Sequence, residues 1–311
     1  MSLHIFKSKH GFEMQISSHG MSLKKLDLPW GISPVVGFLE ESDYENNPLY
    51  HGATVGRMSN RVANSKLLLR GKEYLLSANE KANHLHGGTK GLSKANWEVG
   101  VGDSYITGTY TSPDGEDGYP GEVEIFSSFS FIENSLKIHD LGLSKTYSPL
   151  SITHHPYFSF GGGFEDMVLN VFCNEYLEVD ADLIPTGKVR DFDPEIDEES
   201  EEEIVLSNFD LKEGIDTCFV YPYSENELRK NAELIDLKSK TKITVWSDYP
   251  AFQIYTSINQ LDNVSVPVGA ACVCIEPQYM TGFNQHAHFK GFYFDGKNYY
   301  KHTIVYEFDQ I

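Results

Sequence analysis

Residues Ser151–Phe160 read SITHHPYFSF, a run of β-branched and aromatic side chains that favours extended backbone. Two adjacent histidines lie within it. Because successive side chains of a strand point to opposite faces, His154 and His155 cannot share one environment. Pro156 removes a backbone donor directly after the pair, which is typical of a strand end or a bulge. The run therefore predicts that one histidine faces a cavity; a purely structural pair at a strand end is the alternative.

Aromatic residues are frequent over the whole chain of 311 residues, which holds 19 Phe and 18 Tyr. Such a composition suits half-buried pleated surfaces better than helices. Strands are expected as an opening meander within Leu3–Leu39, and then at Val123–Phe131, Leu136–Leu143, Val168–Asp180, directly after Asp216, Lys240–Ser247, Ala251–Ser257, Ala271–Glu276 and Thr303–Phe308. Many short strands, no convincing helix and no polar linker long enough to separate two cores predict one all-β domain over residues 1–311, a large antiparallel β-sandwich.

Charge and cysteine content exclude several classes of partner. The chain carries 25 basic and 45 acidic residues, a formal charge of −20, which repels nucleic acid and anionic membrane surfaces. Four cysteines are too few and too irregularly spaced for a disulfide framework, and Cys272 and Cys274 are expected to be reduced core residues. The N-terminus lacks the pattern of a signal peptide and no window is long enough for a membrane span. A cytoplasmic location is therefore expected.

The segment Asn79–Gly91, NEKANHLHGGTKG, has no apolar periodicity and is expected to be a loop of the kind that carries functional groups. His84 and His86 form an H-x-H, which on a strand would place both rings on one face, as metal sites require. No carboxylate follows closely as a third ligand. Hydrogen bonding in a cleft is therefore the preferred interpretation of these histidines.

Two further segments have ordinary structural interpretations. Arg70, Gly71 and Lys72 form a tight turn between two apolar runs, which predicts a hairpin. The acidic run from Asp193 to Glu203 is expected to be a solvated surface segment and not a metal or partner tract.

Glu276 ends an apolar strand, where a carboxylate is costly unless it is paired, hydrogen-bonded or functional. It belongs to a set of polar groups offered from loops or strand ends: Arg61, His86, His155, Asp216, Gln253 and Glu276. This set contains an acid and a base but no activated nucleophile, and no Gly-rich loop opens a helix. A cationic acid facing a carboxylate base is the minimum needed to remove a proton from one oxygen while adding a proton to another.

Seven short segments, in one order along most of the chain, resemble motifs of the aldose 1-epimerase (galactose mutarotase) family. They are GRMSNR, HLHGG, SPDGEDGYPG, THHPYF, PTG, GIDTCF and IEPQ. Any one of these motifs is weak evidence, whereas seven in the same order are highly specific. The resemblance implies the large β-sandwich of that family, with no metal or organic cofactor.

The resemblance also implies residue roles. Glu276 would take the proton of the anomeric hydroxyl, and His155 would protonate the ring oxygen. The residues expected to bind sugar hydroxyls are Asn60, Arg61, His86, Asp216 and Gln253. Asp216 is further expected to help keep His155 protonated. The result would be a bell-shaped pH dependence, with its acidic limb set by the ionisation of Glu276 and its basic limb by the loss of the proton from His155.

The chain departs from the family pattern at three places that bear on the choice of sugar. His154 stands where Asn is usual, Ser59 stands where Ala is common, and the segment PQYMTGFNQ after Glu276 differs from the usual loop. A free hexose such as galactose or glucose is the expected substrate, because the motif segments offer few cations for a phosphate. Three alternatives remain open: an epimerase of a hexose 6-phosphate, a non-catalytic carbohydrate-binding protein, and a cupin-like metal enzyme. The sequence does not predict an oligomeric state.

Overall fold

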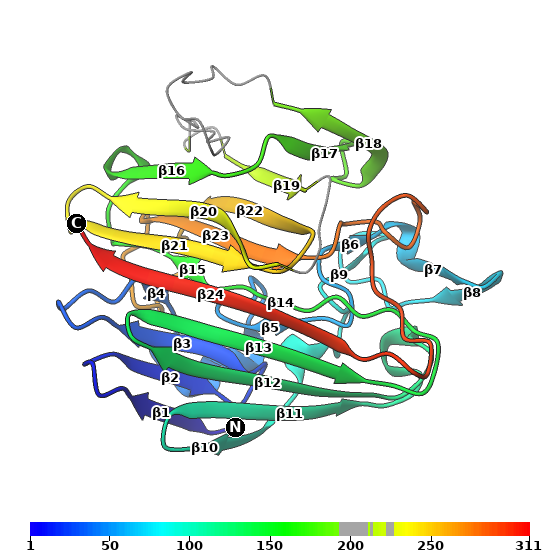
Figure 1. The fold of residues 1–311 in the computed structure, drawn as a ribbon, viewed down its shortest axis with the longest axis horizontal. Coiled ribbons are helices and arrows are strands. Elements are labelled where there is room, and N and C mark those ends of the chain that lie inside the picture. The colour runs from blue at the N-terminus through cyan, green and yellow to red at the C-terminus, as the bar shows by residue number, and fades with distance from the viewer. Residues whose placement is uncertain (193–210, 212–213, 222–226) are drawn as a thin grey trace.

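The front layer of the molecule is an eight-stranded antiparallel sheet (Figure 1). The computed structural model describes residues 1–192, 211, 214–221 and 227–311, so the acidic run from Asp193 to Glu203 lies outside the described residues. From one edge to the other the strands are β10 (Glu98–Val101), β11 (Tyr105–Ser112), β12 (Val123–Ile132), β13 (Ser135–Leu143), β24 (Tyr300–Gln310), β21 (Thr241–Ser247), β20 (Arg229–Asp236) and β16 (Met167–Val171).

A seven-stranded antiparallel sheet packs behind it (Figure 1). Its order is β18 (Pro185–Asp191), β17 (Glu175–Val179), β19 (Asp216–Val220), β22 (Ala251–Ile258), β23 (Ala271–Gln278), β15 (Tyr157–Phe158) and β4 (Val35–Val36). The expected meander forms a separate three-stranded sheet of β1 (Leu3–Lys7), β2 (Glu13–Ser17) and β3 (Ser22–Asp27).

Short elements connect the sheets. The two-stranded pairs are β5 (Thr54–Val55) with β14 (Thr153–His154), β6 (Arg61–Val62) with β9 (His84–Leu85), and the expected hairpin β7 (Lys66–Leu69) with β8 (Lys72–Leu75). The 3₁₀ turns are η1 (Glu41–Asn46), η2 (Ala63–Ser65), η3 (Leu92–Lys94), η4 (Glu116–Gly118) and η5 (Phe164–Asp166). Within the described ranges, no helix has the length and apolar character needed to cross a membrane.

One hydrophobic core fills the space between the two large sheets. Ile138 and Ile304 reach it from the eight-stranded sheet, and Ile254 and Ile275 reach it from the seven-stranded sheet. Alternation along β23 sends Cys272 and Cys274 to the opposite face, into a smaller cluster, where they are buried free thiols as predicted. The all-β sandwich expected from the sequence is therefore confirmed.

The prediction of one strand over Val168–Asp180 is wrong. The chain leaves the eight-stranded sheet after β16 and enters the seven-stranded sheet at β17, so the two halves of the segment pair with different partners. An apolar run records that both halves are buried, but it does not record which sheet each half joins.

Candidate active site

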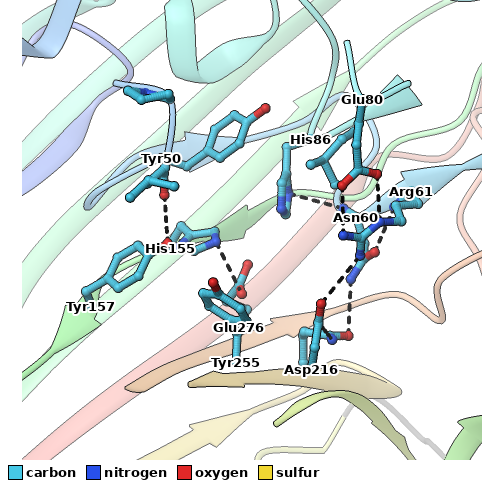
Figure 2. Close-up of a pocket in the computed structure, with 14 residues that line it drawn as sticks. Tyr50, Asn60, Arg61, Glu80, His86, His155, Tyr157, Asp216, Tyr255 and Glu276 are labelled. Carbon is cyan, nitrogen blue, oxygen red and sulfur yellow. Dashed lines mark hydrogen bonds and ion pairs between the residues drawn. The ribbon is translucent and has the colours of Figure 1, made fainter. Parts of the chain in front are cut away.

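A cavity of about 330 Å³ opens on the face of the seven-stranded sheet that points away from the main core. Fourteen residues line it (Figure 2): Pro48, Leu49, Tyr50, Asn60, Arg61, Glu80, Leu85, His86, His155, Tyr157, Asp216, Gln253, Tyr255 and Glu276. All seven residues that the sequence predicted for the site are among them. They come from segments as distant as Asn60 and Glu276, which only the folded chain brings together.

Strand register determines which sheet residues face the cavity. Gln253 of β22 lies directly opposite Glu276 of β23, so their side chains emerge on one face. Ile275 points into the main core, which sends its neighbour Glu276 to the cavity side. Asp216 reaches the same face from the start of β19, where its register partner is Tyr255.

His155 enters the cavity from the segment that follows β14. Its backbone N–H donates to the carbonyl of Ala53 and its carbonyl accepts from Gly52, each at 2.9 Å. The ring Nε2 lies 3.5 Å from Oε1 of Glu276, and these side chains are 6% and 2% exposed. The two groups face one another across the cavity floor (Figure 2). The structure thus brings the expected acid and base within reach of one small molecule.

Burial shifts both members of this pair toward their neutral forms. It lowers the pKa of His155 to about 3, with His51 as a further cause, and it raises the pKa of Glu276 well above its usual range. The charge of Asp216 also raises the pKa of Glu276. The expectation that Asp216 would hold His155 protonated is therefore wrong, because Asp216 acts on the carboxyl and not on the imidazole.

A chain of hydrogen bonds orients the polar wall of the cavity. Asn60 Nδ2 donates to Gln253 Oε1 at 3.1 Å, and Gln253 Nε2 donates to Asp216 Oδ1 at 2.5 Å. Burial raises the pKa of Asp216, while the positive charge of Arg61 opposes that rise. The amide orientations follow from these bonds, so the groups left for a ligand are fixed in advance.

Glu80 belongs to the site but was missed by the sequence analysis. Its carboxylate accepts two hydrogen bonds from Arg61, from Nε at 2.8 Å and from NH2 at 2.9 Å. On its other side, Arg61 NH1 lies 3.7 Å from Asp216 Oδ2. Glu80 stands 19 positions after Arg61 in a segment without periodicity. The pairing depends on the β6–β9 ladder, for which the sequence carries no local signal.

His86 is held as a hydrogen-bond donor. The backbone N–H of Asn60 donates to its Nδ1 at 3.2 Å, which places the ring proton on Nε2. His84 is used elsewhere, since its ring bonds the Ser77 carbonyl and the Tyr119 hydroxyl, each at 2.7 Å. The backbone of His86 is left-handed, with φ of 50°, so strand alternation does not hold and the two histidines do not share one face.

His86, His155 and Glu276 could in principle hold a metal ion, because one ligand atom from each lies within 4.8 Å of the others. A ligating Nε2 needs a free lone pair. In His86 that lone pair is replaced by a proton as long as Nδ1 accepts the Asn60 N–H. The trio therefore fits hydrogen bonding to a polar organic molecule better than ligation of a metal.

Three tyrosines that sequence reasoning did not assign also line the cavity: Tyr50, Tyr157 and Tyr255. Tyr157 stacks on His155 with ring centroids 5.0 Å apart, and its hydroxyl donates to the Leu49 carbonyl at 2.9 Å. The ring of Tyr50 lies 4.8 Å from that of His86. Tyr157 is two positions after His155 in a β-type run, and that spacing is the signal that could have identified it.

His154 points away from the cavity. Its Nε2 lies 3.0 Å from Asp140 Oδ2, and its Nδ1 lies 3.2 Å from Thr54 Oγ1. Ser127 donates to the same carboxylate at 2.5 Å. The residue that departs from the family pattern thus ties the segment carrying His155 to the eight-stranded sheet.

Two of the quoted motifs meet behind the cavity. The buried guanidinium of Arg57 donates to the carbonyls of Gly121 at 2.7 Å and Pro120 at 2.9 Å, and also to the hydroxyl of Ser148. Burial lowers the pKa of Arg57 to about 10. The segment SPDGEDGYPG therefore holds the segment GRMSNR in place and does not line the cavity.

Comparison with known proteins shows what the chain is similar to. The family model described as aldose 1-epimerase matches residues 2–306. The galactose mutarotase of Homo sapiens is 35% identical over 159 residues, 50% of this chain and 46% of that protein. The chain thus matches about half the length of that relative. The aldose 1-epimerase of Escherichia coli (strain K12) is 25% identical over 265 residues, 80% of this chain and 77% of that protein.

Solved structures share the fold. An aldose epimerase homologue from C. elegans superposes with a TM-score of 0.86 and 25% identity, covering 100% of both chains. A galactose 1-epimerase from Lactobacillus acidophilus NCFM superposes with a TM-score of 0.80 and 21% identity, covering 98% of this chain and 93% of that one.

Proposed function

The chain belongs to the aldose 1-epimerase family, and from this premise we propose that it interconverts the α and β anomers of a free hexose such as galactose or glucose. The observation that carries the proposal is the buried pair of His155 and Glu276, 3.5 Å apart in a polar cavity. A volume of about 330 Å³ is at the lower end of the range of ligand pockets, which suits a monosaccharide.

The reaction needs a base at the anomeric hydroxyl and an acid at the ring oxygen, the two oxygens that are bonded to C1. Glu276 removes the proton of the anomeric hydroxyl while His155 gives a proton to the ring oxygen, and the bond between C1 and the ring oxygen breaks. The resulting open-chain aldehyde rotates about C1–C2. Reclosure on the other face returns the proton from Glu276 to the new anomeric hydroxyl and takes the ring-hydroxyl proton back onto His155, so no net proton leaves the site.

The protonation of the free pocket is compatible with this cycle. The active pair, ionised Glu276 with protonated His155, holds one proton, and so does the neutral pair that burial favours. A single proton transfer across the pair interconverts the two forms. Sugar hydroxyls that hydrogen-bond both groups replace water as their solvent and would favour the ionised form.

Orientation of the sugar is assigned to the fixed polar wall. Arg61 and the Nε2–H of His86 supply donors, and the oxygens of Asp216 supply acceptors, while Asn60 and Gln253 hold the wall together. Pre-set groups of this kind lower the cost of positioning a small polar substrate. A mere carbohydrate-binding protein would not need two facing titratable groups with shifted pKa values at the floor of its cavity.

Residues 1–311 act as one domain, which is supported by the single core between the two large sheets. The protein works in the cytoplasm, which is supported by four buried free cysteines that suit a reducing compartment.

Anomer interconversion is tested by polarimetry or proton NMR, starting from pure α-galactose and α-glucose. Catalysed relaxation to the equilibrium anomer ratio, well above the spontaneous rate, is the expected result. A protein that binds hexose but leaves the spontaneous rate unchanged would be a carbohydrate-binding protein, and the proposal would fail.

A further inference from the structure

Arg61 is the only Lys or Arg among the described residues that line the cavity, whereas three carboxyl side chains line it: Glu80, Asp216 and Glu276. An anionic sugar, such as a uronate or a sugar phosphate, is normally recognised by a guanidinium through paired charge-assisted hydrogen bonds. Whether this cavity accepts such a sugar therefore depends on whether Arg61 is available.

Glu80 occupies Arg61 from within the protein. The carboxylate meets Nε and NH2 at 2.8 and 2.9 Å, which is the two-pronged geometry that an anionic ligand would use. The remaining NH1 lies 3.7 Å from Asp216. The side chains of Arg61 and Glu80 are only 12% and 29% exposed, so solvent screens the pair incompletely. The guanidinium can thus still donate hydrogen bonds to sugar hydroxyls, but the carboxylate of Glu80 already neutralises its positive charge.

The nearest lysines do not supply the missing positive charge. Lys81, which follows Glu80, pairs with Asp182 at 2.6 Å. Lys94 donates to the carbonyl of Asn47 at 2.6 Å, with its ammonium 5.3 Å from the ring centre of Tyr50. Lys81 and Lys94 are therefore both engaged by partners within the protein.

We propose that Glu80 is the specificity-determining residue that restricts the site to uncharged sugars. It does so by neutralising Arg61 and by adding its own negative charge at the cavity wall. The inference rests on the proposed function, since it concerns which sugars that reaction accepts. It goes beyond that function by identifying one carboxylate whose removal opens the site to sugars that carry a carboxylate or phosphate.

The variant Glu80→Gln tests the inference, because Gln retains an acceptor for Arg61 and removes only the charge. Asp182→Asn is the matched control, since it deletes one carboxylate outside the cavity lining and frees only the exposed Lys81, while the pair of Arg61 and Glu80 stays in place. Anomer interconversion is measured by NMR exchange for glucose and galactose, and for glucuronate, galacturonate and glucose 6-phosphate. The readout is the ratio of kcat/KM for each anionic sugar to that for its neutral counterpart. Comparing ratios cancels any general loss of activity.

In Glu80→Gln the ratio is expected to rise about tenfold or more, mainly through a lower KM for the anionic sugar, and to rise further at low salt. In Asp182→Asn it is expected to stay within about twofold of the wild-type ratio. Calorimetric binding of glucuronate gives a second readout that does not depend on turnover. An unchanged ratio in Glu80→Gln, or an equal rise in both variants, would overturn the role of Glu80. If no variant and no sugar shows catalysed interconversion, the proposed function itself fails.

Discussion

Glu276 must be ionised to act as a base, yet it lies at the floor of a buried cavity, and burial favours its neutral form. The change Glu276→Gln keeps the shape of the side chain but cannot accept a proton. Turnover is expected to fall about 10²–10⁴-fold with the fold intact. Polarimetric rates with galactose or glucose check this, and a variant that kept more than half of the activity would remove Glu276 from the mechanism.

The same variant has an expected stability change with a definite sign. The pKa of Glu276 is raised on folding, so its contribution to stability is present below its unfolded pKa of about 4.5 and is lost as pH rises toward the folded pKa. Gln does not titrate. The variant should therefore be more stable than wild type at pH 7.5, by about 1 kcal/mol or more, and the gain should shrink toward pH 4.5. Urea unfolding at both pH values measures it.

The pH dependence of activity is expected to be bell-shaped, with limbs that differ from the assignment made from the sequence. The pair holds one proton over the working range; it gains a second as pH falls toward the lowered pKa of His155, and loses its only proton as pH rises through the raised pKa of Glu276. The acidic limb therefore reports His155 and the basic limb reports Glu276. Nitrogen-15 NMR of the free protein should show His155 neutral from pH 5 to pH 8; a ring that titrates near pH 6.5 would contradict this.

His154 and His155 are neighbours with different tasks. His155→Asn should abolish most turnover while leaving stability largely intact. His154→Asn should instead cost stability, about 3 kcal/mol, because it weakens the partnership of Asp140, which is 1% exposed. Kinetics and urea unfolding of both variants separate the two effects. Equal losses of activity, or the reverse order, would show that the strand register at β14 is wrong.

At the level of elements, the approach of two loops decides where His86 lies. Gly87 directly follows His86, and a Cβ at Gly87 would lie 1.7 Å from the carbonyl oxygen of Gly56. Gly71 lies at the tip of the β7–β8 hairpin. Its φ of 82° is close to the φ of 87° at Gly87, but a Cβ at Gly71 would have no atom within 4 Å.

Gly87→Ala should therefore destabilise the protein by several kcal/mol and raise KM, because the loop that carries His86 must move. Gly71→Ala should cost only about 1 kcal/mol from its backbone conformation. Thermal melting and steady-state kinetics compare the two variants. If both changes cost the same, loop contact does not position His86.

For the whole molecule, the shared core predicts cooperative unfolding. Buried residues of both large sheets and of β1–β3 belong to one cluster, so the two large sheets share one main apolar interior. Tryptophan fluorescence, far-UV circular dichroism and loss of activity should follow one coincident transition in urea. Two separated transitions would contradict the single-domain proposal for residues 1–311.

The sequence by itself determined the fold class and most members of the site. Period-two alternation and turn residues located strands such as β12, β13 and β23, because these signals depend only on neighbouring positions. Motif order along the chain identified the family and seven cavity residues. The same local rule separated His155 from His154, since adjacent strand residues face opposite ways.

The tertiary structure alone decided what each site residue meets. The pairing of Glu80 with Arg61, the tie between His154 and Asp140, and the change of sheet between β16 and β17 all depend on contacts between distant segments. The protonation of the pair at Glu276 was also beyond the sequence, because a pKa shift follows from burial and from the charges that face a group. Residue type and spacing indicate which chemistry a side chain can perform. Its surroundings in the folded chain decide its pKa, and therefore its charge in the active site.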